Sequence, residues 1–378
     1  MESEAAYPAA RIVSPKVHAY FARQHAAISD PGAAALATLP DAPSVHEMVD
    51  AAFWASLRRE EGFIPRISLA FVAPDETSHA LLLERPLPLD PGILAKVAPA
   101  VERPGIHLGV ARNSTALHVW GATRKIPRLC LVVEVAAPGL IVIKHHSTDT
   151  AGKFVNVAVL EGDQVKMIGV GTAARSDCPS LLTALLGDGF PHSMQNPVNV
   201  LVQLAISMRA HGRGGSLLVV PASSPASSDE WRESIVQPVP YATSPPFSSL
   251  RELRDTPLDE SGRLRRTVDA VAGLTEVDGA VILTDQYDVL GFGAKITRRK
   301  GRGVVDQVIV TEPIEGDEPV LASPEKLGGT RHLSAAQFVQ DQPNSAAFVA
   351  SQDGRFTVFE WSARESMVHA HRIEALLL

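Results

Sequence analysis

The chain has 378 residues, a length that favours two domains, each with a hydrophobic core of useful size. Hydrophobic residues make up 45% and charged residues 20%, values that are normal for a soluble globular protein. The net charge of −7 and the pI near 6.0 argue against a general nucleic-acid binder and against a protein that binds anionic membranes. A nucleotide site needs only local positive charge, so the acidic total does not count against one.

The cysteines and the hydropathy pattern indicate in which cellular compartment the protein lies. Cys130 and Cys178 form no disulfide framework and have no metal-binding spacing. The first residues are acidic and lack the apolar run of a signal peptide, and no stretch approaches the roughly 18 apolar residues of a membrane helix. We therefore expect a cytoplasmic protein with reduced thiols and no membrane segment.

The first half of the sequence predicts two helices followed by short strands. One helix is expected at 14–28 and another at 44–61, where Ser44 and Glu47 have the spacing of a capping box. Between 67 and 168, short apolar segments alternate with Gly, Pro, Asn and Asp, which favours a largely antiparallel sheet in an α+β domain. The expected strands are 67–72, 106–111, 116–123, 129–136, 140–145 and 155–160, with connecting loops at 63–66 and 87–91.

Two adjacent histidines, His145 and His146, are the most tempting metal ligands in this half. On a strand their side chains point to opposite faces, so they cannot easily share one ion. We expect a structural or solvent-exposed role for both. No cluster of residues in this half identifies a ligand pocket.

A break in the middle of the chain separates the two halves. A short helix is expected at 179–186, and the segment Gly187-Asp188-Gly189 then interrupts regular structure. We place the domain boundary there, with a first domain at 1–189 and a second at 190–378.

The second half has the pattern of an α/β domain. A helix at 196–211 ends in a glycine-rich turn and is followed by an apolar strand at 216–220. The Pro- and Ser-rich stretch 221–250 predicts a surface loop with at most a short extended segment near 236–241. The remaining expected elements are a helix from 262 to about 275 capped by Ser261, strands at 281–283, 289–296, 346–350 and 356–360, and a helix at 333–339.

The motif Asp278-Gly279-Ala280 stands at the start of the strand at 281–283. Its carboxylate can hold a divalent metal, and Gly279 has no side chain, so a large ligand can approach the backbone. A simple turn is the common alternative for Asp-Gly.

The motif Gly329-Thr330-Arg331-His332 stands some fifty residues later, before the helix at 333–339. Backbone N–H groups and the helix dipole favour anions at such a position, and arginine adds donors suited to phosphate oxygens. A helix cap with solvated charges is the alternative.

Together, and in this order, the two motifs resemble those of the diadenylate cyclase (DAC) domain, a family that makes cyclic di-AMP from two ATP molecules. The segments 214–220 and 346–352 resemble the family's first core strand and the strand that ends near the nucleotide. The resemblance covers roughly residues 190–365. The position of the N-terminal half is similar to that of the putative sensor domains that precede some bacterial DAC domains, and it leaves the sensed signal open.

The resemblance implies a mixed sheet with flanking helices, Mg²⁺ or Mn²⁺ as cofactor, and ATP as substrate. It also implies a homodimer in which two domains meet face to face, each with one ATP. Membrane and nucleic acid are not among the expected partners. By residue, it implies metal binding and catalysis for Asp278, phosphate contacts with catalysis for Arg331 and His332, and nucleotide contacts for Gly279, Ala280, Gly329, Thr330 and Ser351. Asp353 lies close to the place of a glutamate that many members carry.

The sequence also departs from the family pattern. Leu333 stands where most members have a second arginine, and Gln352 flanks Asp353. Loss of one phosphate donor slows such a reaction by ~10²-fold without abolishing it. Two hypotheses therefore stay open: an active cyclase with an N-terminal sensor, or a DAC-like module that binds ATP or a cyclic dinucleotide without turnover.

A basic cluster lies between the two motifs. It has two interpretations, a solvated loop or a surface that attracts nucleotide phosphates, and one of its first two arginines could stand in for the missing donor. The cluster consists of Arg298, Arg299, Lys300 and Arg302.

Overall fold

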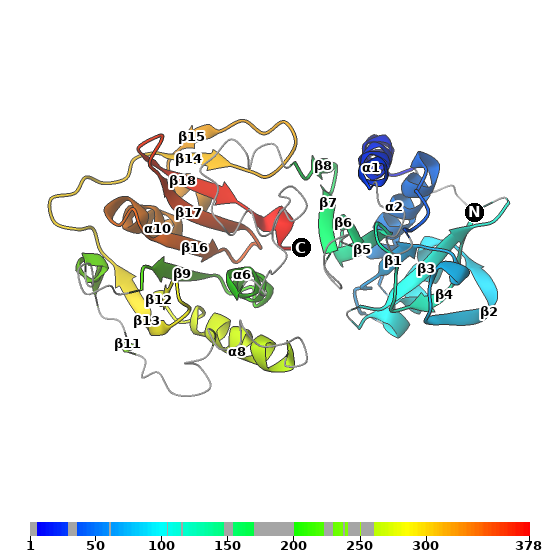
Figure 1. Cartoon of the computed structure of the whole chain (residues 1–378), viewed down its shortest axis with the longest axis horizontal. Helices are drawn as coiled ribbons and strands as arrows, with labels where there is room; N and C mark the ends of the chain where they lie inside the picture. The colour runs from blue at the N-terminus through cyan, green and yellow to red at the C-terminus, as the bar shows by residue number, and fades with distance from the viewer. Residues whose placement is uncertain are drawn as a thin grey trace. The chain divides into compact units, whose positions relative to one another are not determined.

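The computed structural model describes residues 6–28, 36–59, 62–103, 105–114, 116–146, 154–169, 200–222, 230–236, 239–240, 250 and 261–378. Contacts within the chain divide it into two units, Met1–Ile168 with Leu378, and Gly169–Leu377. Figure 1 labels their elements along the chain. The short helix expected at 179–186 and the boundary expected at 187–189 lie outside the described residues.

The first unit is a mixed sheet with helices on one face. Its strands follow the order β2-β4-β3-β1-β5-β6-β7-β8, in which β1 and β3 are parallel and the other described neighbours antiparallel, so the prediction of a largely antiparallel sheet is confirmed. The strands are β1 Ser68–Phe71, β2 Ala80–Pro88, β3 His107–Arg112, β4 Leu117–Thr123, β5 Leu131–Ala137, β6 Leu140–His146, β7 Phe154–Glu161 and β8 Gln164–Met167.

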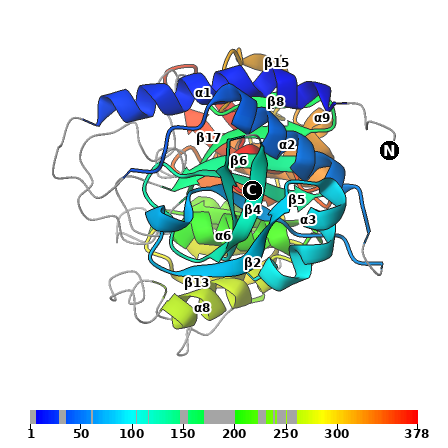
Figure 2. The same cartoon turned by 90° about the vertical axis from the view of Figure 1, so that its right-hand side faces the viewer.

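Helices α1 (Pro8–Ala27) and α2 (Ala42–Ser56) share the core of this unit with one face of the sheet (Figure 2). Helix α1 begins earlier than predicted because Tyr7, which stacks on Phe53 with ring centroids 3.6 Å apart, is buried together with Ala9 and Ala10. Helix α2 is capped by Asp41, which accepts the Ser44 N–H, and not by Ser44 itself. Burial explains the early start of α1, whereas the start of α2 is fixed by the Asp41 cap, which the sequence interpretation placed at Ser44.

The sequence patterns missed β2, β8 and the short helix α3 (Pro91–Val97). Strand β2 is an edge strand with exposed leucines and two prolines, so it lacks the alternation of a half-buried strand. The loop expected at 87–91 is therefore wrong over Leu87 and Pro88, which belong to β2. The predicted structural role of His145 agrees with its complete burial and with the 3.0 Å contact between its Nε2 and the Tyr20 hydroxyl.

The second unit has three layers. Helices α6 (Val200–Ala210) and α8 (Ser261–Leu274) share one core with the sheet, and α10 (Thr330–Asp341) shares another. In β9 (Gly215–Val220) and β12 (Ala280–Thr284), alternate residues belong to the two cores. These strands are therefore buried on both faces, which explains their continuous apolar runs.

The second sheet is also mixed, with the order β10-β13-β12-β9-β16-β17-β18-β14-β15 and β11 paired to β13. Strand β13 has the bounds that the sequence predicted, whereas β18 was missed because its buried residues include His369 and His371. The remaining elements are β10 Ile235–Val236, β11 Val239–Pro240, β13 Val289–Ile296, β14 Val308–Thr311, β15 Val320–Ala322, α9 Glu325–Gly328, β16 Ala346–Ala350, β17 Phe356–Ser362 and β18 Met367–Arg372.

Candidate nucleotide site

Three central strands bring the predicted motifs to one edge of the second sheet. Strands β9 and β12 are parallel with Ser216 opposite Ala280, and β16 is antiparallel to β9 with Gly215 opposite Ala350. The chain therefore enters β12 from Asp278, enters β9 from Gly214, and leaves β16 at Ser351, all at the same edge. The sequence alone placed these residues in three unconnected segments.

Arg331 joins this edge from the first turn of α10. A Cβ atom added to Gly214 would lie 2.8 Å from Arg331 Nη1 and 3.1 Å from the Ala350 carbonyl oxygen. The guanidinium therefore lies beside the start of β9 and the end of β16. Arg331 and Thr330 are both exposed, and Arg331 is near enough to help lower the pKa of Asp278.

Asp278 is paired with Lys295, a residue that the sequence interpretation missed. Lys295 Nζ lies 2.5 Å from Asp278 Oδ2, and the Asp278 side chain is 92% exposed. The hydrogen bond from Lys295 is the main cause that holds the pKa of Asp278 below its ordinary value, so the carboxylate is charged at neutral pH. The predicted hairpin contained a signal for Lys295, because the end of β13 must face the start of β12.

Gly279 allows β12 and β13 to approach closely at this point. Its φ of +118° is a conformation that side chains rarely adopt, and an added Cβ would lie 2.4 Å from the Gly293 carbonyl carbon. The close packing of the hairpin therefore explains by itself why position 279 is a glycine. The next residue, Ala280, is buried at the start of β12.

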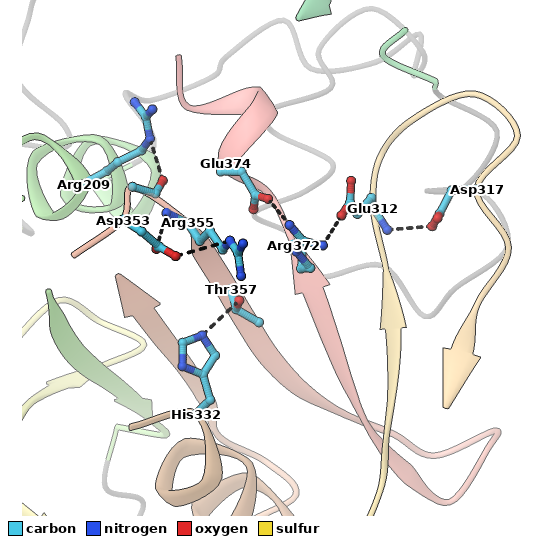
Figure 3. A network of polar contacts seen from close by, with 10 residues as sticks. Arg209, Glu312, Asp317, His332, Asp353, Arg355, Thr357, Arg372 and Glu374 are labelled. Carbon is cyan, nitrogen blue, oxygen red and sulfur yellow. Dashed lines mark hydrogen bonds and ion pairs between the residues drawn. The ribbon is translucent and has the colours of Figure 1, made fainter. Parts of the chain in front are cut away.

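His332 does not share the exposed position of Arg331. It is 1% exposed, and its Nε2 lies 3.4 Å from Thr357 Oγ1 (Figure 3). Its ring meets the Phe359 ring edge-on, with centroids 5.9 Å apart. Burial lowers the pKa of His332, so the imidazole is neutral at pH 7. A neutral, buried ring anchors α10 against β17 and adds no positive charge to the edge.

The turn after β16 contains Ser351, which is half-buried. Its N–H donates to the Arg355 carbonyl at 2.9 Å, and its own carbonyl accepts the Gly354 N–H at 3.2 Å. Asp353 and Arg355 form an ion pair at 3.3 Å, and Arg209 Nε donates to the Gly354 carbonyl at 3.1 Å (Figure 3). The turn is therefore held from both sides, and the Asp353 carboxylate already has a cationic partner.

A second group of charges in Figure 3 belongs to β14, β18 and the C-terminal turn. Arg372 donates to Glu374 at 2.8 Å and also pairs with Glu312, whose backbone N–H donates to Asp317 at 2.7 Å. Arg372 faces Thr357 across the β17–β18 pair, so this cluster lies near the His332 anchor. One arginine faces three carboxylates, so the cluster keeps a net negative charge, and we assign it a structural role.

The basic cluster at 298–302 is not a single surface. Arg299 is held by Glu233, at 2.9 Å, and its backbone N–H donates to Asp341 at 2.8 Å. Arg298, Lys300 and Arg302 are exposed.

Two carboxylates at this edge could meet a divalent cation, Asp278 and Asp353, and each already has a cationic partner. Among the residues that the structure describes, no group of three His, Cys, Asp or Glu side chains could hold a metal ion. Asp278 alone fits the pattern of Mg²⁺ sites that use one or two carboxylates and complete their coordination with substrate phosphates and water. The Lys295 ammonium contacts one oxygen of that carboxylate, which leaves Oδ1 for a cation.

Replacement of Lys295 by glutamine tests this pairing. Because the Lys295 hydrogen bond and charge depress the pKa of Asp278, we expect that pKa to rise towards the ordinary aspartate value of about 3.9. Titration of the Asp278 carboxyl by NMR measures the change. An unchanged pKa in the variant would show that the ion pair is absent in solution, and Lys300→Gln, on an exposed side chain, is the matched control.

Comparison with known proteins gives one family match. Residues 34–124 match the family described as "Probable sensor domain DACNV". The match lies within the first unit and agrees with the sensor role expected there. No curated protein matched the chain.

The chain also has weak likenesses among solved structures, and DacA from Staphylococcus aureus is one of them. A double mutant of DacA from Staphylococcus aureus is 11% identical, with a TM-score of 0.24, over 45% of this chain and 83% of that one. A likeness at this level carries no conclusion about the fold. None of the helices in the described ranges is both long and apolar enough to cross a membrane.

Proposed function

We propose that the second unit is a cytoplasmic diadenylate cyclase and that the first unit regulates it. The main support is the sheet edge that carries Asp278, Arg331 and Ser351, because it presents a carboxylate and a cation near each other. A sensor-like sequence at 34–124 supports the regulatory half of the proposal. The signal that the sensor would detect is a separate question.

The reaction has two identical steps. In each, the 3′-oxygen of one ATP bonds to the α-phosphorus of the other, the bond to the β-phosphate oxygen breaks, and pyrophosphate leaves while the hydroxyl proton passes to solvent. Two ATP molecules thus give cyclic di-AMP and two pyrophosphates. One edge holds one ATP, so we propose that two copies of the chain meet face to face in an isologous dimer.

The exposure and charge of each residue at the edge are consistent with the role that we propose for it. Arg331 is exposed and charged, so it can offset negative charge on the triphosphate. Asp278 is charged and accessible beside it and would orient the 3′-hydroxyl. Gly214 leaves room for the Arg331 guanidinium, Gly279 lets β12 and β13 pack closely beside Asp278, and His332 holds α10 in place as a positioning residue.

A divalent cation, Mg²⁺ or Mn²⁺, would be held by Asp278 and the phosphate oxygens and would supply additional charge stabilisation. Thr330 precedes Arg331 in the first turn of α10, and we assign its backbone N–H group to the phosphates. The Gly329 N–H donates to the Glu325 carbonyl at 3.0 Å, so we assign Gly329 a nucleotide contact through its side-chain-free backbone, where an added Cβ would meet nothing within 4 Å. The position of Ser351, at the end of β16, suits a contact with the nucleoside part of ATP.

The binding module without turnover remains the second candidate, and two observations favour it. Lys295 already contacts the Asp278 carboxylate, and Leu333, at the place of the family's second arginine, packs against the α10 core. Such a module would bind ATP or cyclic di-AMP and signal through the first unit.

Incubation of the purified full chain with ATP and Mg²⁺ or Mn²⁺ distinguishes the candidates. Cyclic di-AMP identified by chromatography and mass supports the cyclase. Saturable binding of ATP or cyclic di-AMP without product supports the binding module. Absence of both product and binding overturns the proposal for this edge.

Replacement of Arg331 by glutamine should lower the rate of cyclic di-AMP synthesis by ~10²-fold, because a transition-state charge loses its cationic donor. The side chain is exposed, so folding should be unaffected. Arg364→Gln is the control, since Arg364 is equally exposed and lies in the turn after β17. Equal rates in the two variants would remove Arg331 from the site.

A further inference from the structure

A hollow of about 750 Å³ opens on the second unit away from the motifs. Its walls come from the loop before β14, from the last turn of α10 and from the ends of β17 and β18 that face each other across their turn. The lining side chains that matter here are Arg302, Asp306, Gln307, Gln340, Trp361 and Met367. The volume is within the range of small-molecule pockets.

This hollow is separate from the edge that carries Asp278. Strand β17 starts at that edge, where Phe356 faces Ala350, and Trp361 follows five residues later. A strand rises about 3.3 Å per residue, so Trp361 lies roughly 16 Å further along β17. A ligand in the hollow would therefore not overlap the proposed ATP site.

The loop that forms one wall is held in place by glutamines of α10. The buried Gln337 accepts the Val305 N–H at 3.0 Å and donates to the Gly303 carbonyl at 3.1 Å. Gln340 Nε2 donates to the same carbonyl at 3.2 Å. Three hydrogen bonds thus fix the backbone between 303 and 305, and the wall is formed before any ligand arrives.

The charged groups on the lining are available for a ligand. Arg302 and Asp306 are both exposed, and neither side chain forms an ion pair or a hydrogen bond with a residue that the structure describes. The hollow therefore offers a guanidinium, a carboxylate and the amide of Gln307 beside the half-buried ring of Trp361. The two formal charges cancel.

We propose that this hollow binds a purine nucleoside. A flat ring can stack on Trp361, and a purine edge has both acceptors for Arg302 and amino or imino donors for Asp306. Glutamine amides can pair with the same edges. A triphosphate fits poorly, since the lining has one cation and a carboxylate that repels phosphate.

Isothermal titration of the full chain with guanosine and with adenosine, without ATP, tests the proposal. We expect saturable binding of at least one nucleoside, weakened ~10-fold or more by Arg302→Gln and by Asp306→Asn, because each loses a charge-assisted hydrogen bond. Both side chains are exposed, so the variants should fold. Arg298→Gln, an exposed arginine of the preceding loop that is outside the lining, should bind as the wild type does.

The Arg331→Gln variant separates this proposal from that of the cyclase. Nucleoside binding in the hollow should be unchanged there, whatever happens to synthesis. Binding that is lost in Arg331→Gln, that survives both Arg302→Gln and Asp306→Asn, or that is absent for both nucleosides would overturn the proposal.

Discussion

Asp278→Asn is expected to lower cyclic di-AMP synthesis by ~10³-fold or more while leaving the fold intact. Asparagine has the same size, but it has no charge to bind a divalent cation or to balance Lys295 and Arg331. The Asp278 side chain is 92% exposed and its polar partner is the half-exposed Lys295, so the thermal unfolding midpoint should stay that of the wild type. Product formation from ATP, followed by chromatography, measures the effect.

Glu318→Gln is the matched control for this variant. Glu318 is an exposed carboxylate in the turn before β15, and its loss changes the net charge by the same amount. We expect full activity in Glu318→Gln. Full activity in Asp278→Asn as well would remove Asp278 from the catalytic machinery. Activity that is lost in both variants would point to net charge as the cause.

Gly279→Ala should destabilise the second unit by about 3 kcal/mol, the sum of left-handed backbone strain and overpacking against β13. The φ of Gly279 is +118°, and an added Cβ would lie 2.4 Å from a backbone atom of Gly293, which cannot rotate away. Relief requires β12 and β13 to separate, which would also draw Lys295 away from Asp278. We therefore expect both lower stability and loss of synthesis.

Gly329→Ala provides the comparison that isolates the clash. Gly329 also has a positive φ, +79°, but an added Cβ would meet nothing within 4 Å. Strain alone should cost about 1–2 kcal/mol there. Differential scanning calorimetry of the two variants measures the difference. Equal losses of stability would show that β12 and β13 are not packed closely at Gly279.

Patterns within short segments predicted much of the second sheet. The bounds of β13 and most of β9, β12 and β16 follow from apolar runs bounded by glycine, aspartate and proline. Such runs are predictable because successive side chains along a strand point to opposite faces of the sheet. The two motifs were also evident in the sequence, and the helix predicted at 333–339 is the central part of α10, which begins three residues earlier at Thr330. Residue types with strong local preferences carried these predictions.

Tertiary contacts decided the remainder. Strand β2 is an exposed edge and β18 buries histidines, so neither has the expected apolar pattern. Lys295 became a partner of Asp278 through the register of β12 and β13, and the orientation of α10 buried His332 while it exposed Arg331. The hollow beside Trp361 combines three parts of the chain that are distant in the sequence: the loop before β14, the last turn of α10 and the β17–β18 hairpin.

The sequence by itself therefore determined which segments become helices and strands where local pattern is strong, and which residues could contact a nucleotide. Only the tertiary structure decided which of those residues meet at one edge, because strand order and register depend on the burial of both faces of the sheet at once. The sequence of one strand does not specify how it aligns with its neighbour. That register is set by the two cores that the sheet shares with α6 and α8 on one face and with α10 on the other.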